Sequence, residues 1–401
     1  MSRYDAIVVG GGAGGGSAAL HLARAGWRVA VVERASFPRR KVCGEFLSSA
    51  TFPVLDAAGI GAAARAAGGP PVTRCGIYGR EAIVTAPMPL APGATDPGRT
   101  VRRDVLDALL LEAAQDAGAE LYQPFRAVGL ESEAGLQTVE IAGDERIERL
   151  TAPIVVAAHG SWEPGTLPTQ IRRPHRPDDL LAFKAYYRGA RFDPDLITLA
   201  AFPGGYGGMV LRDGGDLGLS VCITRAALAR ARREHPAPTA GESAFRHAAA
   251  TTRGVRQAVE GAEFSLVPMG AGPLNPGIRP GYARPVDGGG IFRVGNAAGE
   301  AHPSIAEGIS IAIQSGALLG RHLDRIAPDD RAAVDAAGAA YAAAWRRQFG
   351  GRLRTAELFA RACMSPALTA ALAPVLATFP ALVGLGAVLS GKTKALRLER
   401  A

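Results

Sequence analysis

A cluster of glycines near the start of the chain has the types and spacing that bind a pyrophosphate. Gly10, Gly12 and Gly15 form a G-x-G-x-x-G motif between an apolar run at residues 4–10 and a predicted helix at residues 17–25. In such a loop the first glycine permits a tight turn, the second lets the backbone approach a pyrophosphate, and the third lets helix and strand pack closely. The helix N-terminus adds free N–H groups and partial positive charge. We therefore expect a dinucleotide cofactor here.

The residues around this loop complete the predicted cofactor site. Glu33 ends the next predicted strand, residues 28–32, and its carboxylate can accept hydrogen bonds from ribose hydroxyls. Ala13 and Gly14 inside the loop, and Arg34 after the strand, are expected to line the same site. The pattern does not choose between FAD and NAD, because both bind to it.

A second strand, loop and helix follow much later in the chain. The apolar residues 291–294 run into a small-residue loop and then a helix predicted over residues 305–323. Ser304 and Glu307 have the S-x-x-E spacing of a capping box, which predicts that the helix starts there. Its N-terminus would suit a reduced, anionic flavin ring, and Asn296 could hydrogen-bond a ribityl chain. The cofactor residues predicted in this segment are Gly295, Asn296, Ala297, Pro303, Gly308 and Ile309.

Three segments together resemble the para-hydroxybenzoate hydroxylase and geranylgeranyl reductase superfamily of FAD-dependent oxidoreductases. Residues 294–309 resemble its second FAD motif, usually Gly-Asp-Ala-Ala, with Asn296 in place of the Asp. Residues 37–46 resemble the Pro-x-x-Lys-x-Cys-Gly stretch of its geranylgeranyl-reductase-like and halogenase-like members. The resemblance implies FAD as the cofactor. It also implies that FAD is lined by Arg40, Lys41, Cys43, Gly44, Glu45, Arg103 and Gly160, with Arg39 to Lys41 and Arg103 beside the phosphates.

Two of these assignments have alternatives. Arg103 resembles the family's arginine on the FAD pyrophosphate, but an exposed arginine at a helix start explains it nearly as well. Residues 156–161 lie where many hydroxylases of the family have an Asp-Gly pair that serves FAD and NAD(P)H. Here His159 replaces the Asp before Gly160. We expect FAD binding to be retained and NAD(P)H to be the reductant, although this departure weakens the assignment of the reductant.

The reaction is less well specified than the cofactor. Residues 203–206, Pro-Gly-Gly-Tyr, resemble the start of a cavity motif in geranylgeranyl reductases, but the chain departs from that motif after Gly207. Tyr206, His302 and Cys43 are the candidates for catalysis, each with a purely structural alternative, and no general base is assigned. The tryptophans Trp27, Trp162 and Trp345 are isolated, so the Trp-x-Trp-x-Ile-Pro motif of halogenases is missing and halogenation is excluded.

The resemblance and these residues predict an FAD-dependent oxidoreductase. Its expected activity is NAD(P)H-dependent monooxygenation of a lipophilic or aromatic, polyketide-type natural-product intermediate. Reduction of a carbon–carbon double bond, as in geranylgeranyl reductases, is the first alternative. A non-enzymatic escort protein is the second, because the family's fold also serves such a protein without flavin.

The fold that must position these residues is expected to be α/β. The sequence predicts a discontinuous Rossmann-like FAD-binding domain, an inserted antiparallel sheet that forms the substrate domain, and a C-terminal helical region. The predicted bounds are 1–75, 100–165 and 286–325 for the first, 76–99 and 166–285 for the second, and 326–401 for the third.

Composition limits the remaining function classes. Among 401 residues with net charge +8, the lysines are only Lys41, Lys184, Lys392 and Lys394, and the basic residues are dispersed, so a nucleic-acid partner is not expected. The cysteines have no metal or disulfide spacing, so no metal is predicted. The N-terminus opens directly into a strand pattern, which favours the cytoplasm.

The end of the chain offers a route for a lipophilic substrate. Residues 362–391 carry no charge, but three prolines divide them into pieces too short to span a membrane. A packed helical cap is one interpretation, and an apolar lid or peripheral membrane patch is the other. The oligomeric state is left open.

Overall fold

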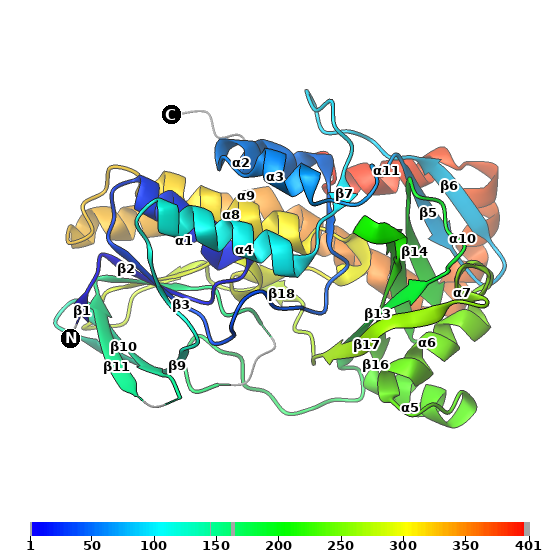
Figure 1. The fold of residues 1–401 in the computed structure, drawn as a ribbon, viewed down its shortest axis with the longest axis horizontal. Coiled ribbons are helices and arrows are strands. Elements are labelled where there is room, and N and C mark those ends of the chain that lie inside the picture. Colours follow the sequence, from blue (N-terminus) through cyan, green and yellow to red (C-terminus); the bar gives the residue numbers. More distant parts are fainter. Residues whose placement is uncertain (1, 145, 162–164, 397–401) are drawn as a thin grey trace.

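A computed structural model describes residues 2–144, 146–161 and 165–396 of the chain. Trp162 and the basic end at Arg397 and Arg400 lie outside the described residues. Two large sheets occupy the two ends of the molecule, and a long helix, α9 (Arg331–Met364), contacts both of them (Figure 1).

The first large sheet is the Rossmann-type sheet that the sequence predicted. Its strand order is β19 (Tyr282–Ala283), β20 (Gly290–Arg293), β12 (Ile154–Ala157), β2 (Ala6–Val9), β3 (Val29–Val32) and β8 (Glu120–Tyr122). All neighbours are parallel except β19, which lies antiparallel at one edge. The three central strands are buried along their whole length, as expected for parallel strands covered on both faces.

Alternate residues of these strands enter two different cores. Ala6 and Val8 pack with the helices α1 (Ala13–Arg24), α4 (Arg103–Asp116) and α8 (Gly308–Leu323). Ile7 and Val9 pack instead against a smaller sheet on the other face. The strands of that smaller sheet are β1 (Ser2–Arg3), β11 (Ile147–Ala152), β10 (Leu136–Ala142) and β9 (Arg126–Glu133).

The second large sheet is mostly antiparallel, with three helices on one face and the C-terminal helices against the other. Its order is β17 (Glu263–Ala271), β13 (Leu180–Arg188), β16 (Leu217–Thr224), β15 (Gly205–Leu211), β14 (Leu196–Phe202), β5 (Arg74–Tyr78) and β6 (Ile83–Pro87). The helices α5 (Arg225–Glu234), α6 (Ala240–Thr251) and α7 (Arg253–Val259) pack on it through a core that includes Phe202, Leu219 and Phe245.

Shorter elements and the C-terminal helices complete the fold. The short elements are β4 (Phe46–Leu47), α2 (Phe52–Ala57), α3 (Gly61–Ala66), β7 (Arg99–Thr100), β18 (Gly277–Ile278) and β21 (Gly299–Glu300). After α9, the chain forms α10 (Pro366–Thr378) and α11 (Ala381–Leu389). α9 buries Tyr341, Trp345 and Phe349, whereas α10 buries none of its residues.

One local prediction was wrong, and three helices were not predicted. Residues 225–259, which the sequence analysis placed only within the substrate domain, form three helices, because an apolar face on each segment packs on the large sheet. The capping box is absent. Ser304 donates a hydrogen bond from Oγ to the carbonyl of Ala356 at 3.0 Å, and α8 starts only at Gly308, without a side-chain cap.

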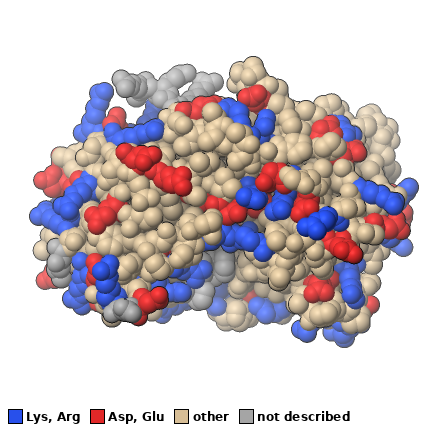
Figure 2. Space-filling model, viewed as in Figure 1, with Lys and Arg blue, Asp and Glu red and all other residues tan. Residues whose placement is uncertain are grey.

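Charged side chains of both signs are interspersed over the face shown in Figure 2. No stripe of a single sign crosses that face.

Candidate functional site

The glycine loop between β2 and α1 has two positions that only glycine can occupy. Gly10 has φ +111°, and a Cβ there would lie 2.6 Å from the carbonyl oxygen of Ala158 in the neighbouring strand. A Cβ on Gly15 would lie 1.8 Å from the carbonyl oxygen of Gly10. These contacts give the turn and the close helix–strand packing that the motif predicted.

Gly12 differs from both because its missing side chain leaves open space. A Cβ there would lie 3.6 Å from guanidinium nitrogens of both Arg39 and Arg103. Gly12 is also the N-cap of α1, and no side chain caps that helix. The free N–H groups of the first turn and two cations therefore face the same space, which suits a pyrophosphate. Arg39 Nε is buried without a hydrogen-bond partner, as expected of a group that awaits an anion.

One buried carboxylate orients these arginines. Asp107 on α4 is fully buried and accepts two hydrogen bonds from Arg103, at 2.9 and 2.7 Å. The same carboxylate lies 3.7 Å from Arg39. Arg103 is therefore a buried member of the site rather than an exposed helix start. Arg40 lies apart, donating to the carbonyl of Val267 at 3.2 Å.

This geometry makes Asp107 a sensitive test of the anion site. In the variant Asp107→Asn the side chain keeps its shape but loses the charge that holds both guanidinium groups, so we expect FAD to bind about tenfold more weakly. Isothermal titration of FAD into flavin-free protein measures this. Asp116→Asn, at the exposed end of the same helix, is the control. Equal affinity in the two variants would contradict the role of Asp107.

A cavity beside the loop suits the adenosine half of the cofactor. It is lined by Val9, Gly10, Gly12, Glu33, Arg34, Arg39, Arg40, Lys41, Phe125, Ala127, His159 and Met269, among others. Glu33 accepts hydrogen bonds from the backbone N–H of Gly11 at 2.8 Å and of Ala35 at 2.9 Å. Its carboxylate thus fixes the loop as well as facing the predicted ribose position.

His159 lies at the same cavity with both ring nitrogens occupied. Nδ1 lies 2.9 Å from the carbonyl oxygen of Gly160, and Nε2 lies 2.9 Å from the Thr169 hydroxyl. Burial lowers the pKa of His159 to about 4, so the ring is neutral near pH 7. His159, which replaces the family's Asp, is therefore a histidine with both ring nitrogens satisfied at a strand end.

A second cavity adjoins the loop and contains most of the remaining predicted residues. It is lined by Gly12, Ala13, Gly14, Lys41, Cys43, Gly44, Glu45, Arg103, Gly160, Tyr206, Gly295, Asn296, Pro303, Gly308 and Ile309, among others. We call it the flavin cavity, because the start of α8 and the glycine loop of α1 both open into it. Three of the predicted residues line neither the flavin cavity nor the cavity for the adenosine half: Gly15 and Ala297, which are buried, and His302.

A polar network fixes the loop before α8. The Asn296 amide donates to Glu300 at 3.2 Å, and Glu300 also accepts from Ser161 Oγ and from the N–H of Asn275, both at 2.7 Å. Burial raises the pKa of Glu300. The side chain of Asn296 is thus held at the cavity wall.

Two of the three catalytic candidates, Tyr206 and His302, contact each other, and the third, Cys43, lies at another part of the flavin cavity. Tyr206 is buried at the flavin cavity, and its hydroxyl lies 3.2 Å from Nδ1 of His302. Burial raises the pKa of Tyr206 and lowers that of His302, which keeps both groups neutral near pH 7. Cys43 lines the same cavity beside the arginine site, where its Sγ accepts a hydrogen bond from the N–H of Glu45 at 3.4 Å.

Sequence reasoning missed a buried polar cluster at this cavity. Glu45 accepts a hydrogen bond from Tyr186 at 2.8 Å and lies 3.6 Å from the ammonium of Lys184. All three side chains are buried, and Glu45 has φ +63°, a conformation rare for a residue with a side chain. A lysine inside an apolar strand, in a chain with so few lysines, was the available signal.

Comparisons with known proteins agree with this site. A family model described as "FAD binding domain" matches residues 3–178, which contain the glycine loop and both arginines. Menaquinone reductase of Mycobacterium tuberculosis is 28% identical over 338 residues, covering 80% of this chain and 76% of that protein. Digeranylgeranylglycerophospholipid reductase of Thermoplasma acidophilum is 31% identical over 162 residues, 40% of each chain.

The fold comparison extends over nearly the whole chain. The FAD-dependent halogenase CndH, a myxobacterial chondrochloren halogenase, matches with TM-score 0.76 and 19% identity, covering 99% of this chain and 95% of that one. This chain matches the superfamily of FAD-dependent oxidoreductases, through the FAD binding domain at residues 3–178 and through its fold. The cradle at Gly12, with its free helix N-terminus and the unpartnered Arg39 Nε, fits the FAD pyrophosphate.

Within the described residues, no single helix is long and apolar enough to cross a membrane. Among the described helices, α9 and α10 reach the length and apolar composition of a membrane span only when they are taken together, and they are bent by 102° at the break between them.

Proposed function

We propose that this FAD-dependent oxidoreductase saturates a carbon–carbon double bond in a long, lipophilic substrate of polyprenyl type. The observation that carries the proposal is an apolar cavity next to the flavin cavity. It lies between the large sheet and the C-terminal helices and is lined by residues such as Ile77, Val84, Phe359, Leu376 and Val383. We call it the chain cavity.

The chain cavity and the flavin cavity share a wall. Ile197, Thr198, Leu199, Ser304 and Ala306 line both of them. A long, flexible apolar substrate could place one segment in the flavin cavity and the rest of its length in the adjoining chain cavity. A compact aromatic substrate would fill the flavin cavity alone and leave the chain cavity unused. The names of the relatives, reductases of menaquinone and of a digeranylgeranyl lipid, support the same substrate class.

Saturation of a double bond requires one hydride and one proton. Reduced FAD supplies the hydride when bound. We assign the donation of this proton to Tyr206, an acid on the wall of the flavin cavity whose hydroxyl contacts His302. Nδ1 of His302 lies 3.2 Å from the Tyr206 oxygen, and in the tautomer with hydrogen on Nδ1 it would donate to that oxygen, which leaves the Tyr206 O–H to be given to the substrate. The phenolate would regain its proton from Nδ1 of His302 as Nε2 takes up a proton from water, so both side chains return to their neutral forms. The apolar walls position the chain and exclude water.

NAD(P)H-dependent monooxygenation is the second candidate. It is favoured by the polar groups at the flavin cavity, Asn296 and Glu300, which could orient a compact aromatic substrate. We retain NAD(P)H as the proposed reductant for either reaction. The remaining alternative, a non-enzymatic escort protein, requires a chain that binds no flavin. A purified protein that takes up no FAD would favour this alternative.

An anaerobic experiment separates the two reactions. The holoenzyme is reduced chemically without oxygen and mixed with a digeranylgeranylglycerol ether lipid, which contains no quinone ring. We expect the absorbance of oxidised flavin to return with the lipid alone. If it does not return before air is admitted, reduction is wrong, and a product heavier by one oxygen that forms only in air would favour monooxygenation.

We further propose that the apolar face formed by α10 and α11 rests on a lipid bilayer. Leu368, Leu372, Val375 and Phe379 on α10 are 44% to 60% exposed, and Leu385 on α11 is 51% exposed. Leu372 and Leu385 also line the chain cavity, so that cavity opens on this face. A lipid chain could therefore pass from the bilayer into the cavity without crossing water.

Charged substitutions test this membrane face. The double variant Leu372→Glu, Leu385→Glu is expected to lower binding to anionic phospholipid vesicles about tenfold in a sedimentation assay, because two carboxylates would enter the apolar layer. Ile147→Glu, at an exposed site on the distant small sheet, is the matched control. Unchanged vesicle binding would refute the membrane face, and a dimer in wild type that the double variant abolishes would assign the face to a second copy.

A further inference from the structure

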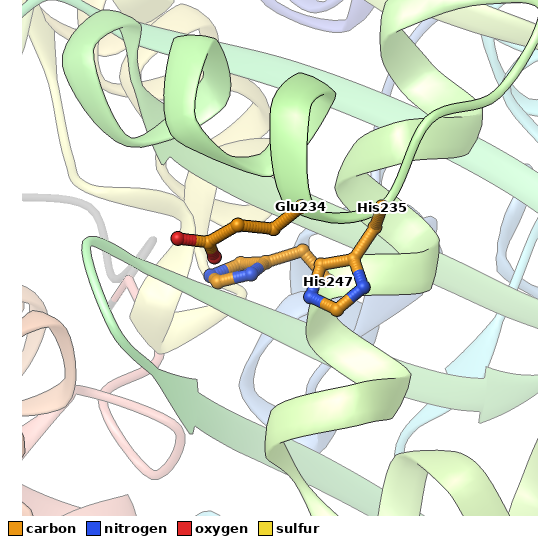
Figure 3. A group of neighbouring side chains, drawn as sticks. All are labelled: Glu234, His235 and His247. Atoms are coloured by element: carbon orange, nitrogen blue, oxygen red, sulfur yellow. The ribbon is translucent and has the colours of Figure 1, made fainter.

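Three potential metal ligands meet between α5 and α6, beside the turn that joins β14 and β15. Glu234 ends α5, His235 follows it, and His247 lies on α6, with their side chains converging between the two helices (Figure 3). One ligand atom from each lies within 4.8 Å of the other two. None of the three lines the flavin cavity or the chain cavity.

His247 is the most informative of the three. Its side chain is 2% exposed, and its Nε2 lies 3.1 Å from the carbonyl oxygen of Pro203. Because a carbonyl only accepts, Nε2 must carry the hydrogen, and Nδ1 therefore carries the lone pair. Nδ1 is buried and has no hydrogen-bond partner. Metal-binding histidines show this arrangement, with one ring N–H donated to a carbonyl and the other nitrogen free for the metal.

His235 and Arg230 lie close to His247. The two imidazole rings lie with centroids 5.5 Å apart and a 46° tilt, so they are not stacked on each other. Arg230, one turn before Glu234 on α5, places a positive charge near His247, and the carboxylate of Glu234 offsets this charge.

We propose that Glu234, His235 and His247 bind a divalent transition metal of the zinc class. Two imidazoles and a carboxylate are a common zinc donor set, with water completing a tetrahedron. Ligand bonds of about 2.0–2.2 Å would bring neighbouring ligand atoms to roughly 3.3–3.5 Å, a distance that side-chain rotation at the exposed Glu234 and half-buried His235 can supply.

The site has a structural consequence for the oxidoreductase. Through its hydrogen bond to Pro203, His247 holds the turn between β14 and β15, and Tyr206 lies three residues further along that turn and strand. A metal on Nδ1 would fix the His247 ring and so stiffen this turn. The metal would act as a structural clamp on the substrate domain, independent of the proposed reaction.

Zinc titration of the tag-free, FAD-loaded full chain tests the proposal. We expect one Zn²⁺ per chain by calorimetry and a rise in Tm of roughly 3 °C at saturation. The variants Glu234→Gln and His235→Gln, both at accessible positions and so expected to fold, should each weaken Zn²⁺ binding about tenfold or more and reduce the rise in Tm.

A distant histidine provides the control. His175→Gln, at a side chain 70% exposed in the same half of the protein, should bind Zn²⁺ as wild type does. The proposal is overturned if wild type binds no stoichiometric Zn²⁺, or if Glu234→Gln and His235→Gln leave the affinity and the Tm shift unchanged.

Discussion

The variant Gly12→Asp is expected to lose FAD binding while keeping the fold. A Cβ at this position enters the space between Arg39 and Arg103, and the added carboxylate would occupy the place of the pyrophosphate and repel it. The backbone of Gly12, at φ −74° and ψ −176°, is ordinary for a residue with a side chain. Asp is also a favoured N-cap, so α1 should be as stable as before or more so.

Flavin content and thermal stability measure these two effects separately. We expect the FAD dissociation constant of Gly12→Asp to rise at least 100-fold, roughly 3 kcal/mol, with Tm unchanged in flavin-free protein. Gly351→Ala on α9, where a Cβ would meet nothing within 4 Å, is the matched glycine control. A Gly12→Asp protein that purifies with stoichiometric FAD would show that the cofactor lies elsewhere.

Tyr206→Phe is expected to lower the rate of substrate saturation about 100-fold. The change removes one hydroxyl at the flavin cavity, and a positioned general acid contributes about 10²–10⁴-fold to the rate. FAD content should not change, because Tyr206 touches none of the residues at the anion site. A lower kcat with little change in KM is the expected pattern, since the hydroxyl acts in the chemical step.

A second tyrosine on the same sheet serves as the control. Tyr78→Phe, on β5, removes a hydroxyl that lines neither cavity, so its kcat should stay close to wild type. Single-turnover reoxidation of reduced flavin by the lipid measures the chemical step directly. If Tyr206→Phe retains more than half of the wild-type rate, another group delivers the proton.

The parts of the fold that the sequence predicted are those coded by local patterns. The apolar run at β2, the glycine loop and α1 follow one another within one short segment, and the close contact that requires Gly15 lies within that segment, at Gly10. The second strand, loop and helix, at residues 291–323, could be predicted from the same kind of local pattern. In both cases the residue types report a backbone that must approach a cofactor closely.

The parts that could not be predicted depend on distant contacts. Ser304 and Glu307 have capping-box spacing, but Ser304 bonds to Ala356 and Glu307 lies 3.4 Å from Lys392, so tertiary partners override the local motif. Lys184 and Tyr186 meet Glu45 only because β13 crosses the cavity, and no spacing in the sequence announces that. The pairing of His235 with His247 likewise depends on how α5 and α6 pack.

CndH shares 19% identity with this chain, so its likeness shows the fold alone. We propose that this chain does not halogenate, because it lacks the Trp-x-Trp-x-Ile-Pro motif. The substrate class therefore rests on the chain cavity and its shared wall with the flavin cavity.

The mass of the product tests the central claim most directly. Holoenzyme reduced without oxygen is mixed with menaquinone, and the product is then exposed to air, which returns a reduced quinone ring to the quinone but leaves a saturated side chain unchanged. The account predicts a product heavier by two hydrogens after this exposure. Recovery of the original mass, or a product heavier by one oxygen formed only in air, would contradict it.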